Sequence, residues 1–187
     1  ENDSKSRQLA RFMKEIGERY MDQLEVKLIY RNDRFLRGGD HTPFAREGFT
    51  AIRVCEMNEN YYHQHENVRV ENGIQYGDLP EFVDFEYMRK VTGINLASLY
   101  SMASAPSEPQ TVGIDVRKLS NTSTLRWEAP AKGKAKGYYV LMRETDSSTW
   151  EKKFYTEATT LTIPYSKDNY FFAVQAVGEG GHESMAV

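Results

Sequence analysis

Short alternating apolar runs fill residues 106–187, and this pattern constrains the fold more strongly than any other feature of the sequence. Alternation with a period of two is typical of β-strands that turn one face towards a core. The alternating positions are Val112, Ile114 and Val116; Leu125 and Trp127; Tyr139, Leu141 and Arg143; Phe154; Leu161 and Ile163; and Phe172, Val174 and Ala176. Roughly six or seven strands in about 80 residues is the density of a β-sandwich. The sequence therefore predicts an all-β second half.

Three motifs in this half resemble the fibronectin type III domain, and the resemblance extends over residues 107–187. The motifs are Leu125-Arg126-Trp127-Glu128-Ala129-Pro130, Gly137-Tyr138-Tyr139-Val140, and Tyr170-Phe171-Phe172-Ala173-Val174-Gln175-Ala176-Val177 followed by Gly178 and Gly180. The resemblance implies that Trp127 lies in the core and that Tyr170 begins the sixth strand. Residues 183–187 are short for a final strand, so we expect that strand to be incomplete.

The sequence Ser104-Ala105-Pro106-Ser107-Glu108-Pro109 separates two kinds of pattern. Helical periods dominate before it, and alternating runs follow it. Closely spaced Pro and Ser residues are typical of a connecting segment. We therefore predict two domains, 1–105 and 106–187, joined by a linker of only a few residues.

Two long helices are predicted in the first domain. Apolar residues at helical spacing from position 9 to position 20 indicate the first helix, with Ser4 or Ser6 as its N-cap. A second helical pattern covers residues 84–103. Its predicted buried stripe consists of Val83, Tyr87, Met88, Val91, Ile94, Leu96 and Leu99.

Between these helices the sequence predicts two strands and two loops. Residues 25–30 alternate and residues 50–54 are apolar, so both runs are predicted to be strands. Residues 31–48 are expected to form a loop and a short helix, and residues 56–80 a long irregular loop of the kind that is often functional. Helix, strand, loop, strand and helix in that order indicate an α/β fragment, because two strands are too few for a sheet with helices on both faces.

Charge and composition exclude several functions. The formal net charge of −3 gives no basis for binding nucleic acid or an anionic membrane. No apolar run approaches the roughly 20 residues that a transmembrane helix needs. Cys55 is the single cysteine, which excludes an internal disulfide framework, and we expect its thiol to be structural. Because the chain opens with Glu1 and shows no signal peptide, we expect a processed or truncated product.

Three of the four histidines, His41, His63 and His65, lie close together in a stretch rich in carboxylates. Neutral imidazole is the commonest protein ligand for zinc, and a carboxylate often accompanies it. A polar surface loop with solvated histidines would have the same composition. Composition alone therefore leaves a metal site and a solvated loop as alternatives.

Two motifs in this region resemble the C-terminal portion of the dinuclear-zinc aminopeptidases, which include exopeptidases related to bacterial leucyl aminopeptidase and, more distantly, glutaminyl cyclase. They are Gly39-Asp40-His41-Thr42-Pro43-Phe44, followed by Gly48-Phe49-Thr50-Ala51, and Tyr62-His63-Gln64-His65. The resemblance covers roughly residues 3–104, and residues 68–78 are similar to a bacterial branch of the family. In these enzymes two zinc ions share a bridging Asp, and a Glu acts as general base on the bridging water.

The resemblance implies roles for a few residues of this chain. The last metal ligand of the family maps to His65 or, in the less favoured register, to His63. Asp40 and His41 match an element that lines the substrate cleft, where His41 would donate to a bound carbonyl and Asp40 would orient it. A simple turn after Gly39 is the alternative interpretation of Asp40.

The other ligands of the family, a His-x-Asp pair, paired glutamates and a further Asp, have no counterpart in this sequence. A zinc site needs about four ligands, so one histidine cannot hold a dinuclear centre. The chain alone is therefore predicted not to hydrolyse peptides. Arg31, Arg34 and Arg37 are expected to make salt bridges or to cover the surface.

Two functional hypotheses follow. In the first, the chain is the C-terminal piece of a secreted or periplasmic bacterial zinc aminopeptidase, which removes N-terminal residues from peptides. The fibronectin-like module would then hold the enzyme to a partner or pack against the catalytic domain. In the second, the chain is a non-enzymatic binding protein whose module contacts protein or carbohydrate. Neither hypothesis involves nucleic acid or a transmembrane segment.

Overall fold

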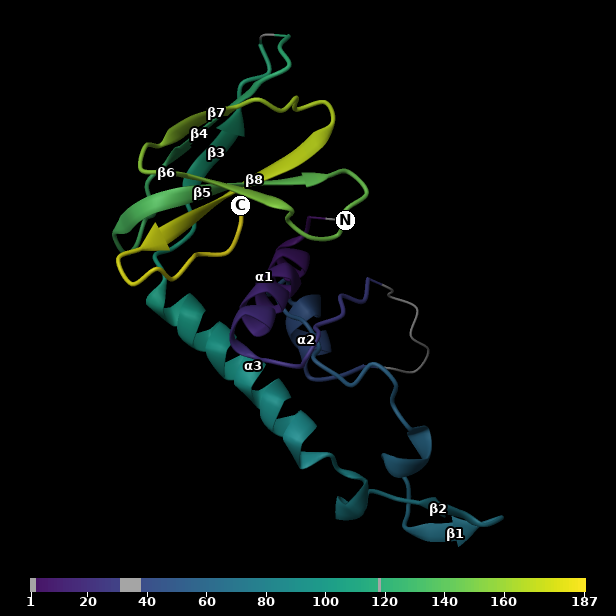
Figure 1. The fold of residues 1–187 in the computed structure, drawn as a ribbon. Helices are drawn as coiled ribbons and strands as arrows, with labels where there is room; N and C mark the ends of the chain where they lie inside the picture. The colour runs from purple at the N-terminus through teal and green to yellow at the C-terminus, as the bar shows by residue number, and fades with distance from the viewer. Residues whose placement is uncertain (1–2, 31–37, 118) are drawn as a thin grey trace.

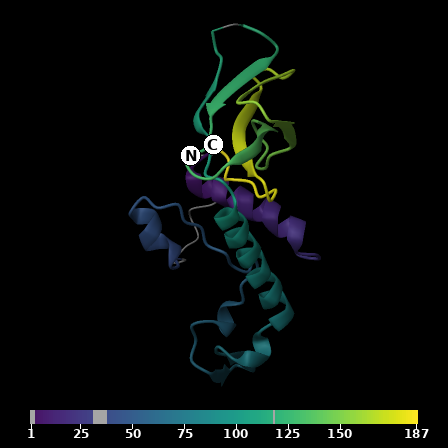
Figure 2. The same cartoon turned by 90° about the vertical axis from the view of Figure 1, so that its left-hand side faces the viewer.

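The computed structural model describes residues 3–30, 38–117 and 119–187. A β-sandwich lies at one end, and a small hairpin of β1 (Arg69–Glu71) and β2 (Ile74–Tyr76) lies at the other (Figure 1). The long helix α3 (Phe85–Ser104) runs from the hairpin end to the sandwich, as the turned view also shows (Figure 2). Within the described residues, no helix combines the length and apolar character that a bilayer span requires.

The second half consists of two antiparallel sheets packed face to face. Their strands are β3 (Gln110–Ile114), β4 (Ser123–Glu128) and β7 (Thr160–Ile163) in the order β3-β4-β7, and β6 (Lys152–Thr156), β5 (Ala135–Glu144) and β8 (Tyr170–Gly178) in the order β6-β5-β8. The end of the chain extends the second sheet, because Val187 and Val174 exchange backbone hydrogen bonds of 2.9 and 3.1 Å. This is the sandwich architecture of fibronectin type III domains, so the all-β prediction is confirmed.

The core of the sandwich forms around Trp127, as predicted. The Trp127 side chain is 5% exposed, and its ring meets that of Tyr138 edge-on at 5.4 Å. The other buried members of the cluster are Leu125, Val140, Ile163, Val174 and Ala176. Tyr170 begins β8, which is the sixth strand of the sandwich, so this prediction is also confirmed. Val116 lies beyond the end of β3 and is exposed.

Both predicted long helices form, and glycines allow them to approach closely. Helix α1 (Lys5–Tyr20) begins after Ser4, whose Oγ accepts a hydrogen bond from the Arg7 backbone N–H at 3.3 Å. A Cβ on Gly17 would lie 3.1 Å from the Ile94 side chain of α3. The contact between α1 and α3 therefore depends on the missing side chain at position 17.

The two predicted strands at residues 25–30 and 50–54 do not form, so the α/β sheet fragment is wrong for the described residues. The expected alternation is nevertheless present, because Val26, Leu28 and Tyr30 are more buried than the residues between them. A strand needs a neighbour whose backbone groups complete the ladder, and among the described residues neither run has one. An alternating apolar pattern without a neighbouring strand therefore gives an extended segment and not a β-strand.

The long loop predicted for residues 56–80 instead contains secondary structure. It holds the single-turn helices η1 (Tyr61–His63) and η2 (Pro80–Phe82) and the hairpin β1–β2. Asn72 and Gly73 join β1 to β2 with φ of 52° and 80°. Asn-Gly is the preferred pair for a two-residue hairpin turn, so the signal was present in the sequence.

The predicted buried stripe of α3 is also wrong for most of its members. Ile94 is 6% exposed, but Leu96 and Leu99 are 67% and 63% exposed. The buried face of α3 consists of Ile94, Ser98 and Ser101, which recur at helical spacing. Apolar residues surround much of this helix, and helix α1 covers only one side of it.

Candidate functional site

His65 occupies an unusual backbone conformation just after η1. Its φ is 56°, in the left-handed region that costs energy for residues other than glycine. The His65 N–H donates to both carboxylate oxygens of Asp78, at 3.1 and 3.3 Å. Asp78 therefore fixes the backbone of the residue that the family resemblance assigns as a metal ligand.

The environments of His63 and His65 differ in a way that bears on their roles. The His63 ring stacks on Phe82, with centroids 3.6 Å apart, and its Nδ1 lies 3.3 Å from the Asn60 side-chain nitrogen. The His65 side chain is exposed, and among the described residues its ring has no recorded hydrogen bond or ring contact. The His65 ring nitrogens are thus the more available pair. This agrees with the favoured register, although the assignment stays a prediction.

Asp40 and His41 do not form the predicted pair. Asp40 precedes helix α2 (His41–Arg46), is exposed, and makes no capping hydrogen bond with its side chain. The His41 Nδ1 is buried without a hydrogen-bond partner in the described part of the chain, so Asp40 does not orient it here. A backbone hydrogen bond of 2.9 Å from Thr42 to Gly39 shows the turn that was the alternative interpretation.

The described residues do not make a zinc site. Over residues 3–30, 38–117 and 119–187, no group of three His, Cys, Asp or Glu side chains could hold a metal ion. No recorded contact in these ranges joins His41 to His65. Zinc needs about four ligands, so His65 alone does not fit the ion.

Of the acidic residues near this region, the sequence predicts no role for Asp78 and a solvated side chain for Glu59. Asp78 holds His65, and the only sequence signal for it was its place at the end of the family-like stretch 68–78. Glu59 is largely buried and accepts a 2.8 Å hydrogen bond from Arg53. Burial, together with the charge of Glu56, raises the pKa of Tyr87 at the start of α3. The predictions for Arg31, Arg34 and Arg37 lie outside the described residues.

A cluster of charged residues joins α1 to the sandwich. Arg143 of β5 is 2% exposed and binds both carboxylate oxygens of Asp3 at 2.9 Å. Arg11 of α1 binds the same carboxylate at 3.0 Å and donates from its Nε to the Ser148 carbonyl at 2.8 Å. The loop between β5 and β6 is therefore tied to the first turns of α1.

A second cluster ties the other end of α1 to the same sheet. Glu15 of α1 pairs with Lys153 of β6, and Arg19 pairs with Glu183 at 3.0 Å. Glu183 belongs to the segment that lies along β8 and is almost completely buried. Helix α1 thus lies against the β6-β5-β8 sheet on the side opposite the Trp127 core.

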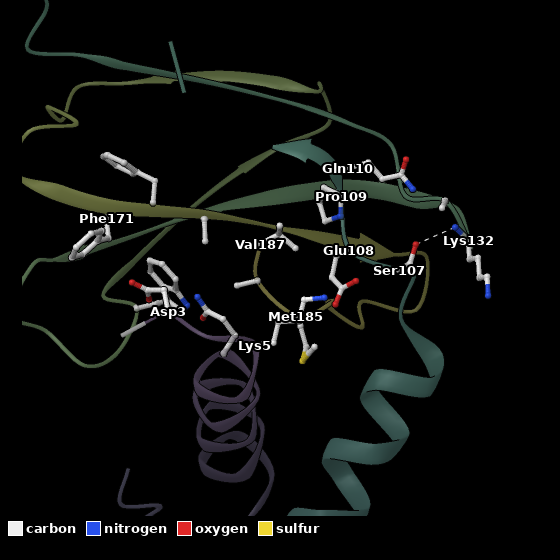
Figure 3. A pocket seen from close by; sticks show the side chains of 16 residues that line it. Asp3, Lys5, Ser107, Glu108, Pro109, Gln110, Lys132, Phe171, Met185 and Val187 are labelled. Carbon is white, nitrogen blue, oxygen red and sulfur yellow. Dashed lines mark hydrogen bonds between the residues drawn. The ribbon is translucent and has the colours of Figure 1, made fainter. Parts of the chain in front are cut away.

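A cavity of about 780 Å³ opens where α1, the linker and β8 meet. Figure 3 shows Asp3 and Lys5 from the start of α1 on one side, with Phe171 and Val187 from the sandwich above them. None of the histidines assigned to a site lines this cavity. The cavity is therefore separate from the His65 region.

The chain is similar along its entire length to fungal proteins named probable zinc metalloproteases. It is 46% identical over 188 residues to one from Leptosphaeria maculans, and 42% identical over 192 residues to one from Pyricularia oryzae. The alignments include 100% of this chain but only 44% and 38% of those proteins. The chain thus spans less than half the length of these relatives. These relatives are fungal, so they do not support the expectation of a bacterial protein.

No protein-family model matches the chain. Among solved structures, an Fn3-like protein from Clostridium thermocellum matches 44% of this chain and 86% of that one, with 24% identity and a TM-score of 0.36. The fn3 domain of human collagen alpha-1(XX) matches 45% of this chain and 81% of that one, with 20% identity and a TM-score of 0.37.

Proposed function

We propose that this chain is the C-terminal part of a secreted zinc aminopeptidase, completed by a region that carries the remaining metal ligands. The observation that carries this proposal is the similarity of the whole chain to probable zinc metalloproteases more than twice its length. Within the proposed enzyme, His65 supplies one metal ligand and Asp78 holds its backbone. His41 contacts the substrate and does not bind metal.

The exposed surface of the first half supports the proposal that this chain is one part of a longer enzyme. Large apolar side chains are exposed along α3 and around α2, including Phe44, Phe49, Phe85, Leu96 and Leu99. In soluble proteins, exposed apolar surface beyond a few hundred Å² marks an interface. In the described residues no strand pairs with the extended runs at 25–30 and 50–54, where side chains bond only the backbone of Val26 and Ala51. We infer that the rest of the enzyme covers α3 and pairs with these runs.

Activity measurements on two proteins test the proposal. The longer natural protein should release 4-nitroaniline from leucine 4-nitroanilide, and should lose this activity when the amine is acetylated, because an aminopeptidase needs a free N-terminus. The 187-residue chain with added zinc should show no turnover. Hydrolysis of the acetylated substrate by the longer protein would indicate an endopeptidase, and turnover by the short chain would contradict the missing ligands.

The non-enzymatic alternative receives less support from the module. One outer face of the sandwich is already in contact with α1 and the residues before it, because Arg143 pairs with Asp3 and Lys153 pairs with Glu15. On the other sheet, Thr124 and Thr162 face outward, and their hydroxyl groups form a hydrogen bond of 2.8 Å. The β6-β5-β8 face of the module already packs against α1 of the first half. This arrangement fits a module that packs against the catalytic part.

A further inference from the structure

The loop between β3 and β4 contains the sequence Asn121-Thr122-Ser123. Asn-x-Ser with a central residue other than Pro is the acceptor sequence for N-linked glycosylation. In both views this loop lies at the tip of the sandwich, far from α1 and from the β1–β2 hairpin (Figures 1 and 2). A glycan at this tip would not obstruct the contacts with α1 or the His65 region.

The side chain of Asn121 is available for modification. It is exposed, and among the described residues its amide has no recorded hydrogen bond. The backbone around it is held by a turn, in which the Thr122 N–H donates to the Ser120 Oγ at 3.1 Å. The amide therefore projects from an ordered turn and takes no part in holding the turn together.

The same loop has apolar surface that a glycan would cover. Leu119 is 98% exposed, two residues before Asn121, and Val116 is also exposed. At the start of the loop, a hydrogen-bonded ion pair with Arg117 holds the pKa of Asp115 well below its usual range.

Ser123 indicates when the sugar would be attached. It is 1% exposed, and its Oγ donates to the Tyr165 carbonyl at 2.7 Å. In the ladder between β4 and β7, Ser123 is paired with Ile163. The hydroxyl that defines the acceptor sequence is therefore hidden once the sandwich closes. Transfer therefore has to precede pairing of β4 with β7, after which Asn121 stays exposed while Ser123 is buried.

We propose that Asn121 carries an N-linked glycan, an inference that rests on the proposed secretion of the protein. The co-reactant is a polyprenyl-pyrophosphate-linked oligosaccharide. The Asn121 amide nitrogen bonds to C1 of the first sugar and gives up one proton, while the bond from C1 to the pyrophosphate oxygen breaks. The lipid pyrophosphate leaves with the bonding electrons, and no oxidant or reductant is involved.

The test is site-resolved mass spectrometry on the 187-residue chain, secreted from yeast behind a cleavable signal sequence. Trypsin separates residues 119–126 from residues 1–5, which hold a second acceptor sequence, Asn2-Asp3-Ser4. Enzymatic removal of the glycan in ¹⁸O water should label Asn121. Asn121→Gln should abolish the label on the 119–126 peptide, whereas the matched variant Ser123→Thr should keep it.

Three outcomes decide between the inferences. An unmodified Asn121 in the secreted chain overturns the glycan inference and leaves the proposed secretion untouched. Modification in yeast, together with a natural protein that carries the same glycan, supports both. A natural protein confined to the cytosol with Asn121 unmodified overturns both. Thermal unfolding of Asn121→Gln made in bacteria, where no glycan is added, should match that of the unmodified chain and so exclude a folding effect of the substitution.

Discussion

The two halves of the chain bury their apolar residues to very different extents. In residues 107–187, the two sheets bury one another, and Val140 and Val174 are completely inaccessible. In residues 1–105, helices α1 and α3 share one narrow contact, and the opposite side of α3 is open. A sandwich supplies both walls of its own core, whereas two crossed helices without a sheet do not. The first half therefore depends on neighbours, and α1 finds one of them in the sandwich.

Cutting the chain at the linker should produce the largest effect. Residues 106–187 alone should unfold cooperatively, because the Trp127 cluster lies wholly within them. Residues 1–105 alone should aggregate. The segment that begins α1 would lose its contacts with Arg143 and Lys153, and the apolar surface of the first half is already exposed. Size-exclusion chromatography and amide NMR dispersion of each fragment provide the measurement. A well-dispersed, monomeric spectrum from 1–105 would show that the first half is self-sufficient.

Truncation of the central tryptophan tests the closed core. Trp127→Ala should destabilise the full chain by about 3–5 kcal/mol, because it leaves a cavity between the two sheets. Urea unfolding followed by circular dichroism measures the loss. Trp127→Phe is the matched control and should cost clearly less. A small loss for the alanine variant would mean that the ring is not the centre of the core.

Two positions on α3 test the open surface directly. Ile94→Ala should cost about 2–5 kcal/mol in this chain, since Ile94 packs against α1 at Gly17. Leu96→Ala, two residues away and exposed, should stay within about 0.5 kcal/mol. In the longer natural protein, Leu96→Ala should become destabilising if the rest of the enzyme covers α3. An equally small effect of Leu96→Ala in both proteins would show that this face of α3 is not covered in the longer protein.

The three histidines test how the first half contributes to the longer enzyme. His65→Ala should lower activity by about 100-fold or more and reduce zinc content, because loss of a ligand costs at least as much as loss of its supporting partner. His63→Ala should be mild in both respects, since its ring stacks on Phe82. His41→Ala should lower turnover with zinc content unchanged. Zinc stoichiometry and rate are measured together, and zinc lost from His63→Ala alone would move the assignment by two residues.

Among the substitutions expected to destabilise this chain, the smallest loss is expected at the junction of the two halves. Asp3→Ala should cost about 1–3 kcal/mol, because the buried Arg143 loses its carboxylate partner while Asp3 itself is partly exposed. Glu179→Ala removes an exposed carboxylate that pairs with the exposed Lys134, and it should leave stability almost unchanged. Urea unfolding compares the two variants. Equal effects would mean that the junction behaves like an ordinary surface ion pair.

Local signals were sufficient for some elements of the first half and not for others. Ser4 and Asp84 are helix caps that a sequence can identify, because a cap bonds to residues only three positions away. The strands expected at 25–30 and 50–54 failed because a ladder needs a distant partner that a short apolar run cannot reveal. Asp40 and His41 are adjacent in sequence, yet adjacency did not bring their side chains together.

The sequence by itself determined the sandwich, since alternating strands and the place of Trp127 follow from a repeating pattern with period two. It also determined which histidines were candidates for a site. Only the tertiary structure decided that α1 lies on the β6-β5-β8 sheet, that Asp78 holds His65, and that the apolar residues of α3 remain open. These features depend on contacts between residues far apart in the chain. Periodicity records which face of an element is apolar, but not what will cover it.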